Sequence, residues 1–216
     1  MNSQTPIFYY LLILGIGSLV ASCAMPEGVD KLEVPHSIRV STKLPWSSVS
    51  LETTTNGSGA PIDGLPIEWD LSTLKSFSVH YEKPIGENTS MAAGLAHRTY
   101  DFDQIPDLTS PEATLSGRYY FDSIGTFRPF VNAGLIMNSG FSYRPSGQTN
   151  KSTTSPWMGM TYGFGALHRQ SKHVATDLRL GYETTLTPGV ETTASGITQD
   201  FSPSGWVAQI SLSYLF

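Results

Sequence analysis

The chain has little cysteine and little charge. Cys23 is its only cysteine, so an intrachain disulfide is impossible. Charged residues make up 14% of the sequence, against about 25% in typical soluble domains. The net charge of -5 argues against nucleic acid as a partner.

Long hydrophobic runs are also missing from most of the chain. Beyond residue 24 no apolar run approaches the length of about 18 residues that a membrane-spanning helix needs. Low charge without such runs is what alternating strands with one lipid-facing side would give. The composition therefore favours strands over helices as the main elements.

The N-terminus carries the one sustained apolar run, Ile7 to Ala21. It is short for a membrane span and suits the core of a signal peptide, although no Lys or Arg precedes it. The ending Leu19-Val20-Ala21-Ser22-Cys23 resembles the lipobox of bacterial lipoproteins. Two alternatives stay open: lipidation at Cys23, or ordinary cleavage after Ala24. We expect a signal peptide at 1–23, a periplasmic N-terminal segment at 24–46 and a barrel at 47–216.

The C-terminal segment alternates strictly. Because side chains in a strand have a period of two, one face is wholly apolar or aromatic. That face comprises Trp206, Ala208, Ile210, Leu212, Tyr214 and Phe216. The other face is mostly small or polar. A strand with an apolar outer face, a polar inner face and a terminal Phe is typical of a transmembrane β-barrel.

Similar alternation recurs along the chain and predicts seven strands. They cover residues 77–82, 91–100, 113–121, 127–141, 157–168, 174–185 and 206–216. An eighth, the first in order, lies between 36 and 54. We favour Ser47 to Thr53, with Val49 and Leu51 outward and Glu52 inward. The rival is Ser37 to Leu44, and Pro45 prevents one uninterrupted ladder through both. An even count of eight fits bacterial barrels.

The predicted connections alternate in length. Short links fall at residues 83–90, 122–126 and 169–173, and long ones at 55–73, 101–113, 142–156 and 186–203. This regularity fits short periplasmic turns and long extracellular loops. The expected fold is all-β: a single antiparallel up-and-down barrel of eight strands.

Polar residues collect on the inward faces of these strands. Since unpaired polar groups are costly away from bulk water, we expect an ion-paired network that fills the bore. Its predicted members are Glu52, Glu82, Arg98, Arg118, Arg128, Asp177, Arg179 and Glu183. No metal site or cofactor is expected.

Two hairpins show a resemblance to a known family. Arg118-Tyr119-Tyr120-Phe121, a turn and the segment 127–135, followed by 160–166, a turn and 177–182, resemble hairpins of the small OmpA-like and OmpW-like outer-membrane barrels. The resemblance implies a bacterial outer-membrane location amid lipid and lipopolysaccharide, without the appended peptidoglycan-binding domain of OmpA-like proteins. It also implies an assembly signal for the barrel-assembly machinery, carried by Ile210, Leu212, Tyr214 and Phe216.

The sequence leaves the molecular role open. A structural or surface-interaction barrel is favoured, because eight strands enclose only enough space for side chains. A narrow channel or transporter for small, perhaps apolar, solutes is the alternative, as OmpW-like proteins are thought to be. An outer-membrane lipid-modifying enzyme is less favoured, since only His97 lies near the outer rim with carboxylates, Asp101 and Asp103, above it. A soluble lipocalin-like barrel would need an apolar lumen and a polar exterior.

Overall fold

The computed structural model describes residues 34, 36–44, 47–56, 66–102, 107–144, 152–192 and 198–216. These residues form one β-sheet and no helix. Within the described ranges, therefore, no helix is long and apolar enough to cross a bilayer. The predicted signal peptide, including Cys23, lies outside these ranges.

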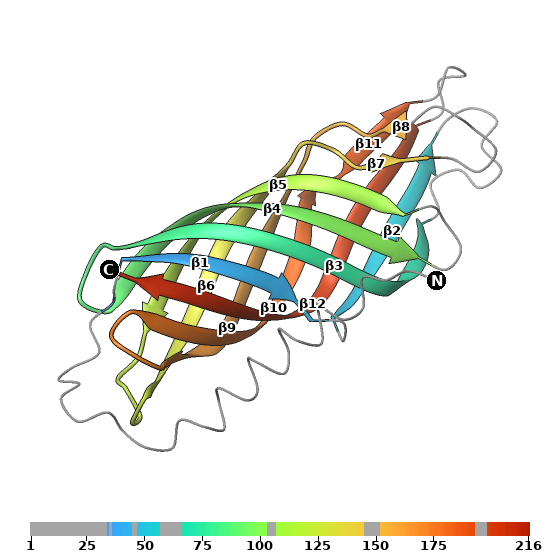
Figure 1. Ribbon diagram of the computed structural model, residues 1–216. Coiled ribbons are helices and arrows are strands. Elements are labelled where there is room, and N and C mark those ends of the chain that lie inside the picture. Colours follow the sequence, from blue (N-terminus) through green and yellow to red (C-terminus); the bar gives the residue numbers. More distant parts are fainter. Residues whose placement is uncertain are drawn as a thin grey trace.

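The sheet closes into an antiparallel barrel (Figure 1). Its strand segments are β1 (Ser37–Lys43), β2 (Ser48–Asn56), β3 (Pro66–Pro84), β4 (Thr89–Phe102), β5 (Leu108–Tyr120), β6 (Phe127–Asn138), β7 (Ser142–Tyr143), β8 (Ser152–Thr153), β9 (Trp157–Arg169), β10 (Val174–Thr187), β11 (Gly189–Thr192) and β12 (Thr198–Leu215). The wall has eight strand positions. β1 and β2 together occupy the first position, and the other seven are occupied by β3, β4, β5, β6, β9, β10 and β12. Because β12 pairs with both β1 and β2, the barrel has no open edge. The predicted all-β, eight-stranded fold is confirmed.

The first strand position is formed by both candidate segments, the one around Ser37 to Leu44 and the one around Ser47 to Thr53. β1 and β2 each pair with β3 on one side and β12 on the other. Lys43 lies opposite Gln209, and Ser48 lies opposite Trp206, so the chain advances five positions between β1 and β2 where β12 advances three. Because the difference is an even number of residues, the inward and outward alternation of β1 and β2 stays in phase. The barrel therefore begins at Ser37, and the predicted start at Ser47 is wrong.

The predicted facing of β2 is also wrong. Val49 and Leu51 are buried in the lumen, and Glu52 is exposed on the outer side. The prediction assumed that the apolar side chains of this strand face lipid. At this height, however, the lumen is filled with apolar side chains, so Val49 and Leu51 pack inward.

Several strands are longer than a membrane crossing requires. β3 has 19 residues and β12 has 18, whereas a tilted transmembrane strand needs about 9–11. Parts of the predicted long loops are therefore strand. β2, β7, β8 and β11 gather at one end of the barrel, and the C-terminus lies at the other (Figure 1). By the rule of short periplasmic turns, the end with β7, β8 and β11 is extracellular; we call it the extracellular extension.

The outer surface of the wall is apolar. In β12, Leu212 and Tyr214 are 52% and 55% exposed, while Ser211 and Ser213 are each 3% exposed. The same alternation places Phe77, Leu95 and Phe164 outside. A soluble barrel would show the opposite arrangement, so the lipocalin-like alternative is excluded.

Candidate functional site in the barrel lumen

Charged side chains from opposite walls meet in the middle of the lumen. Six of the predicted network members are buried there: Glu82, Arg98, Arg118, Asp177, Arg179 and Glu183. They come from β3, β4, β5 and β10. Because β4 and β10 lie on opposite sides of the barrel, bonds between them cross the bore.

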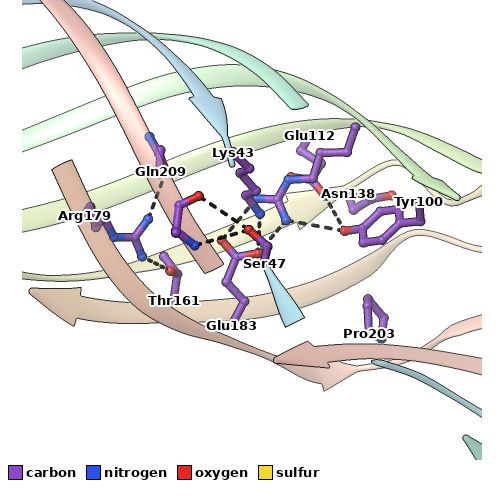
Figure 2. Close-up of polar contacts among 12 residues, drawn as sticks. Lys43, Ser47, Tyr100, Glu112, Asn138, Thr161, Arg179, Glu183, Pro203 and Gln209 are labelled. Carbon is purple, nitrogen blue, oxygen red and sulfur yellow. Dashed lines mark hydrogen bonds and ion pairs between the residues drawn. The ribbon is translucent and has the colours of Figure 1, made fainter. Parts of the chain in front are cut away.

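The cluster nearer the extracellular end, the upper cluster, consists of Lys43, Arg98, Glu112 and Glu183 (Figure 2). Glu183 accepts hydrogen bonds of 2.6 Å from both Lys43 Nζ and Arg98 Nη1. Arg98 Nε lies 2.5 Å from Glu112 Oε2. Glu112 also accepts a hydrogen bond from Asn138 at 3.1 Å. Each carboxylate thus faces a guanidinium, the pairing that gives the strongest hydrogen bonds.

The cluster nearer the periplasmic end, the lower cluster, consists of Arg39, Glu82, Arg118 and Asp177. Arg39 Nη1 lies 2.5 Å from Glu82, and Arg118 Nη1 lies 3.4 Å from Asp177 and 3.7 Å from Glu82. The hydroxyls of Ser90 and Tyr120 donate to Glu82, and that of Ser211 donates to Asp177. Both carboxylates of this cluster thus accept bonds from several donors, and such multiple bonding makes a buried polar network rigid.

Arg179 and His80 lie between the two clusters. Arg179 donates to Asn132 Oδ1 at 2.8 Å, to Gln209 Oε1 at 3.2 Å and to Thr161 Oγ1. Two of these bonds, to Gln209 and Thr161, are visible in Figure 2. The His80 ring contacts Thr114 Oγ1 and lies over Gly94, where an added Cβ would come within 2.1 Å of the ring. A glycine is therefore required beneath this imidazole.

Apolar clusters close the polar zone at both ends. On the extracellular side, Phe141 is fully buried and packs against Tyr100, Trp157 and Phe201 at ring separations of 5.6–6.2 Å. On the periplasmic side, Tyr120, Phe130, Leu167 and Leu215 form a second cluster. Arg118 lies over the Phe130 ring, 4.3 Å from its centroid. The lumen is therefore a packed interior that alternates apolar, polar and apolar along its axis.

Two of the predicted network residues do not belong to it. Glu52 points outward, as described above. Arg128 is buried at the periplasmic end, where it donates to Asn88 Oδ1 and to the Phe121 carbonyl. It lies at the start of β6, and its guanidinium carbon is 5.2 Å from the centroid of the Tyr120 ring.

Three network members were missed by sequence reasoning. Arg39 and Lys43 belong to β1, and their signal was present: Ile38 and Val40 alternate with them. Glu112 falls in the predicted long link at 101–113. In the structure β5 pairs with β6 only from Glu112 onward. Pro111 therefore sits where its missing N–H costs no ladder bond to β6.

The other predicted site residues lie on the outer surface. Leu212, Tyr214 and Phe216 project outward from the last strand, and Ile210 lies on the same face, half-buried. His97 is exposed on the outer side of β4. The Asp101 carboxylate lies 3.7 Å from Lys75 Nζ.

We compared the sequence and the structure with those of known proteins. No family model and no curated relative matches the sequence. Among solved structures, the chain is similar to the outer membrane protein AlkL, with 14% identity, a TM-score of 0.52 and coverage of 89% of this chain and 95% of that one. It is similar to OprG from Pseudomonas aeruginosa, with 11% identity, a TM-score of 0.51 and coverage of 86% and 98%. It is also similar to Neisserial surface protein A, with 14% identity, a TM-score of 0.49 and coverage of 83% and 97%. The protein therefore has the fold of the small eight-stranded outer-membrane β-barrels.

Proposed function

We propose that the protein is a closed barrel of the bacterial outer membrane whose working surface is its extracellular extension, not its bore. The observation that carries this proposal is the filled lumen. The two ion-paired clusters lie between two apolar clusters. The cavity among the charged side chains has a volume of about 40 Å³, enough for only a few waters.

The extracellular extension is itself an ordered structure. Tyr143 of β7 donates a hydrogen bond to the Glu191 carboxylate of β11. Burial and that carboxylate raise the pKa of the Tyr143 phenol, so it stays protonated and donates at neutral pH. The Ser155 amide donates to the Val190 carbonyl at 2.7 Å, and the Val190 amide donates to Ser155 Oγ at 2.9 Å. These bonds tie two extracellular connections together, as a stable contact surface requires.

Planar-bilayer conductance tests the closed bore. Protein reconstituted at known density is compared with protein-free bilayers and with an open porin. We expect no stepwise conductance above the protein-free baseline. Reproducible steps that scale with protein density would contradict the proposal and support the alternative, a narrow pathway for small solutes. The observation that favours this alternative is the polar lining of the 40 Å³ cavity.

Outer-membrane lipid, lipopolysaccharide and the barrel-assembly machinery are the proposed partners. The outward residues Leu212, Tyr214 and Phe216 support the last of these. Phe216→Asp should reduce the amount of heat-modifiable barrel in membranes while export continues. Ile124→Asp, at an exposed apolar position in a periplasmic turn, is the control. Equal barrel yields from the two variants would count against a specific assembly role.

An enzymatic role has less support. His97 points away from the lumen, and the Asp101 carboxylate lies 3.7 Å from Lys75 Nζ. Within the described ranges, no three His, Cys, Asp or Glu residues are grouped closely enough to hold a metal ion. We therefore propose that the protein has no catalytic activity.

A further inference from the structure

The charges in the lumen do not balance. Between the two apolar clusters, the described side chains include five cations and four carboxylates. The cations are Arg39, Lys43, Arg98, Arg118 and Arg179, and the carboxylates are Glu82, Glu112, Asp177 and Glu183. All nine are at least nine-tenths buried. One positive charge is therefore in excess in a region where uncompensated charge is costly.

The excess is located at Arg179. Each of the other four cations lies within 4 Å of a carboxylate oxygen. Arg179 instead donates only to the neutral oxygens of Asn132, Gln209 and Thr161 among the described side chains. Neutral acceptors satisfy part of the guanidinium's hydrogen-bonding capacity, which is five N–H donors, but leave its charge without an ion-pair partner within 4 Å among the described residues.

A cavity lies against Arg179. Its lining includes all five cations but only one of the four carboxylates, Glu183. Glu82, Glu112 and Asp177 do not line it. The cavity is therefore bordered mainly by positive charge. Its volume of about 40 Å³ would hold about three waters or one small inorganic anion.

Two further groups on the cavity lining have spare hydrogen-bonding capacity. Arg39 Nε and His80 Nδ1 are buried and have no hydrogen-bond partner among the described residues. Arg39 is an obligate donor. His80 Nδ1 becomes a donor when Nε2 accepts the hydrogen bond from Thr114. Buried donors without acceptors are rare in folded proteins, and an anion supplies the acceptor that they lack.

We propose that this cavity is a binding site for one small monovalent inorganic anion of the chloride class. Arg179 is its counter-charge, and Arg39 and His80 are its additional donors. The anion neutralises the excess charge between the two clusters and becomes a structural part of the lumen. The proposal does not depend on the closed bore, because a channel could hold the same ion.

The test uses the purified, detergent-folded protein and bromide as the probe. Thermal unfolding is followed in sodium bromide and in sodium gluconate of equal ionic strength, since gluconate is too large for the cavity. We expect a higher midpoint in bromide, saturating with concentration. Crystals grown in bromide should show an anomalous peak beside the Arg179 guanidinium.

Three variants separate this site from general salt effects. Asn132→Asp places a carboxylate at the position that accepts the Arg179 Nε hydrogen bond, so it should supply the counter-ion internally. It should fold without bromide and lose the bromide-dependent shift. Arg179→Gln removes the excess charge and should lose the shift too. Arg169→Gln, at a periplasmic turn where Arg169 donates to the Ser171 and Lys172 carbonyls, should keep it.

Two results would overturn the proposal. One is an unchanged wild-type midpoint in bromide together with no anomalous peak in the lumen. The other is a bromide shift that persists at full size in Asn132→Asp and Arg179→Gln, because the ion would then act elsewhere on the protein.

Discussion

Glu183 and Glu52 have the same side chain but opposite surroundings. Glu183 is buried between Lys43 and Arg98, and Glu52 is exposed on the outer side of β2. Removing one partner of a buried ion pair leaves an uncompensated charge. Residue-scale effects in this barrel should therefore depend on facing much more than on residue type.

Glu183→Gln should lower the free energy of unfolding by roughly 3–5 kcal/mol, because Lys43 then loses its carboxylate. Urea unfolding of the detergent-folded barrel, followed by tryptophan fluorescence, measures the change. Glu52→Gln is the control and should stay within about 0.5 kcal/mol of wild type. Similar losses from the two variants would show that the assigned facing is wrong.

The close approach of the His80 ring to Gly94 predicts that a larger residue at position 94 destabilises the barrel. A Cβ at this position would lie 2.1 Å from His80 Cδ2 and 2.7 Å from the Val79 carbonyl oxygen. Gly94→Ala should therefore destabilise the barrel by about 1–3 kcal/mol, the usual cost of overpacking. Adding His80→Ala should recover part of the loss, since the ring is then gone.

Gly117→Ala is the matched control for this steric prediction. A Cβ added at Gly117 would lie 3.9 Å from the Ser90 carbonyl oxygen, an ordinary contact distance. The same urea assay should therefore show little change. A loss at Gly117 as large as that at Gly94 would indicate a general strand effect and not contact with His80.

At the scale of elements, β10 carries both membrane wall and extracellular extension. Leu180 is outward and pairs with Phe164 and Ala208 in the middle of the wall. Leu186 is 51% exposed, near the extracellular end of the same strand. The two leucines therefore lie at different depths in the membrane on the outer surface of the same strand.

Leu180→Arg should cost roughly 2–4 kcal/mol in lipid bilayers, and Leu186→Arg about 0–1 kcal/mol, because the penalty falls toward the interface. Unfolding in phospholipid vesicles measures both. A larger loss at Leu186 than at Leu180 would mean that the membrane boundary is misplaced along β10.

The elements could be predicted from sequence wherever both periodicity and hydrophobicity point to the same face. That holds for β12, β10 and β9, in which apolar residues meet lipid and polar or small residues line the lumen. It fails for β2, since its apolar residues enter the lumen. It also fails for β1, because Pro45 suggested that only one of the two candidate segments joins the wall, whereas both β1 and β2 pair with β12 and β3.

The polar network was predictable in part for the same reason. The alternation of side chains along each strand identifies Arg98, Asp177 and Glu183 as inward-facing. This alternation alone does not show which strands lie opposite each other in the barrel. The cross-bore pair of Arg98 and Glu183 needs the strand order as well as the register. Arg39 and Lys43 became visible only once β1 was placed in the wall.

At the scale of the whole molecule, the barrel combines an apolar exterior, a charged middle and apolar ends of the lumen. The lipid-facing surface holds the protein in the membrane, and the filled lumen keeps the wall rigid. Under the function proposed above, the working surface is the part that extends beyond the bilayer. This arrangement depends on every wall strand keeping alternate side chains in lipid.

Site-directed spin labelling along β12 tests that arrangement most directly. Single nitroxides are placed at consecutive positions from Gln209 to Tyr214 in vesicle-reconstituted protein. Collision rates with oxygen and with a polar nickel complex are then measured. We predict high oxygen accessibility with period two, with maxima at Ile210, Leu212 and Tyr214. Maxima at Ser211 and Ser213, or no periodicity, would contradict the transmembrane barrel described here.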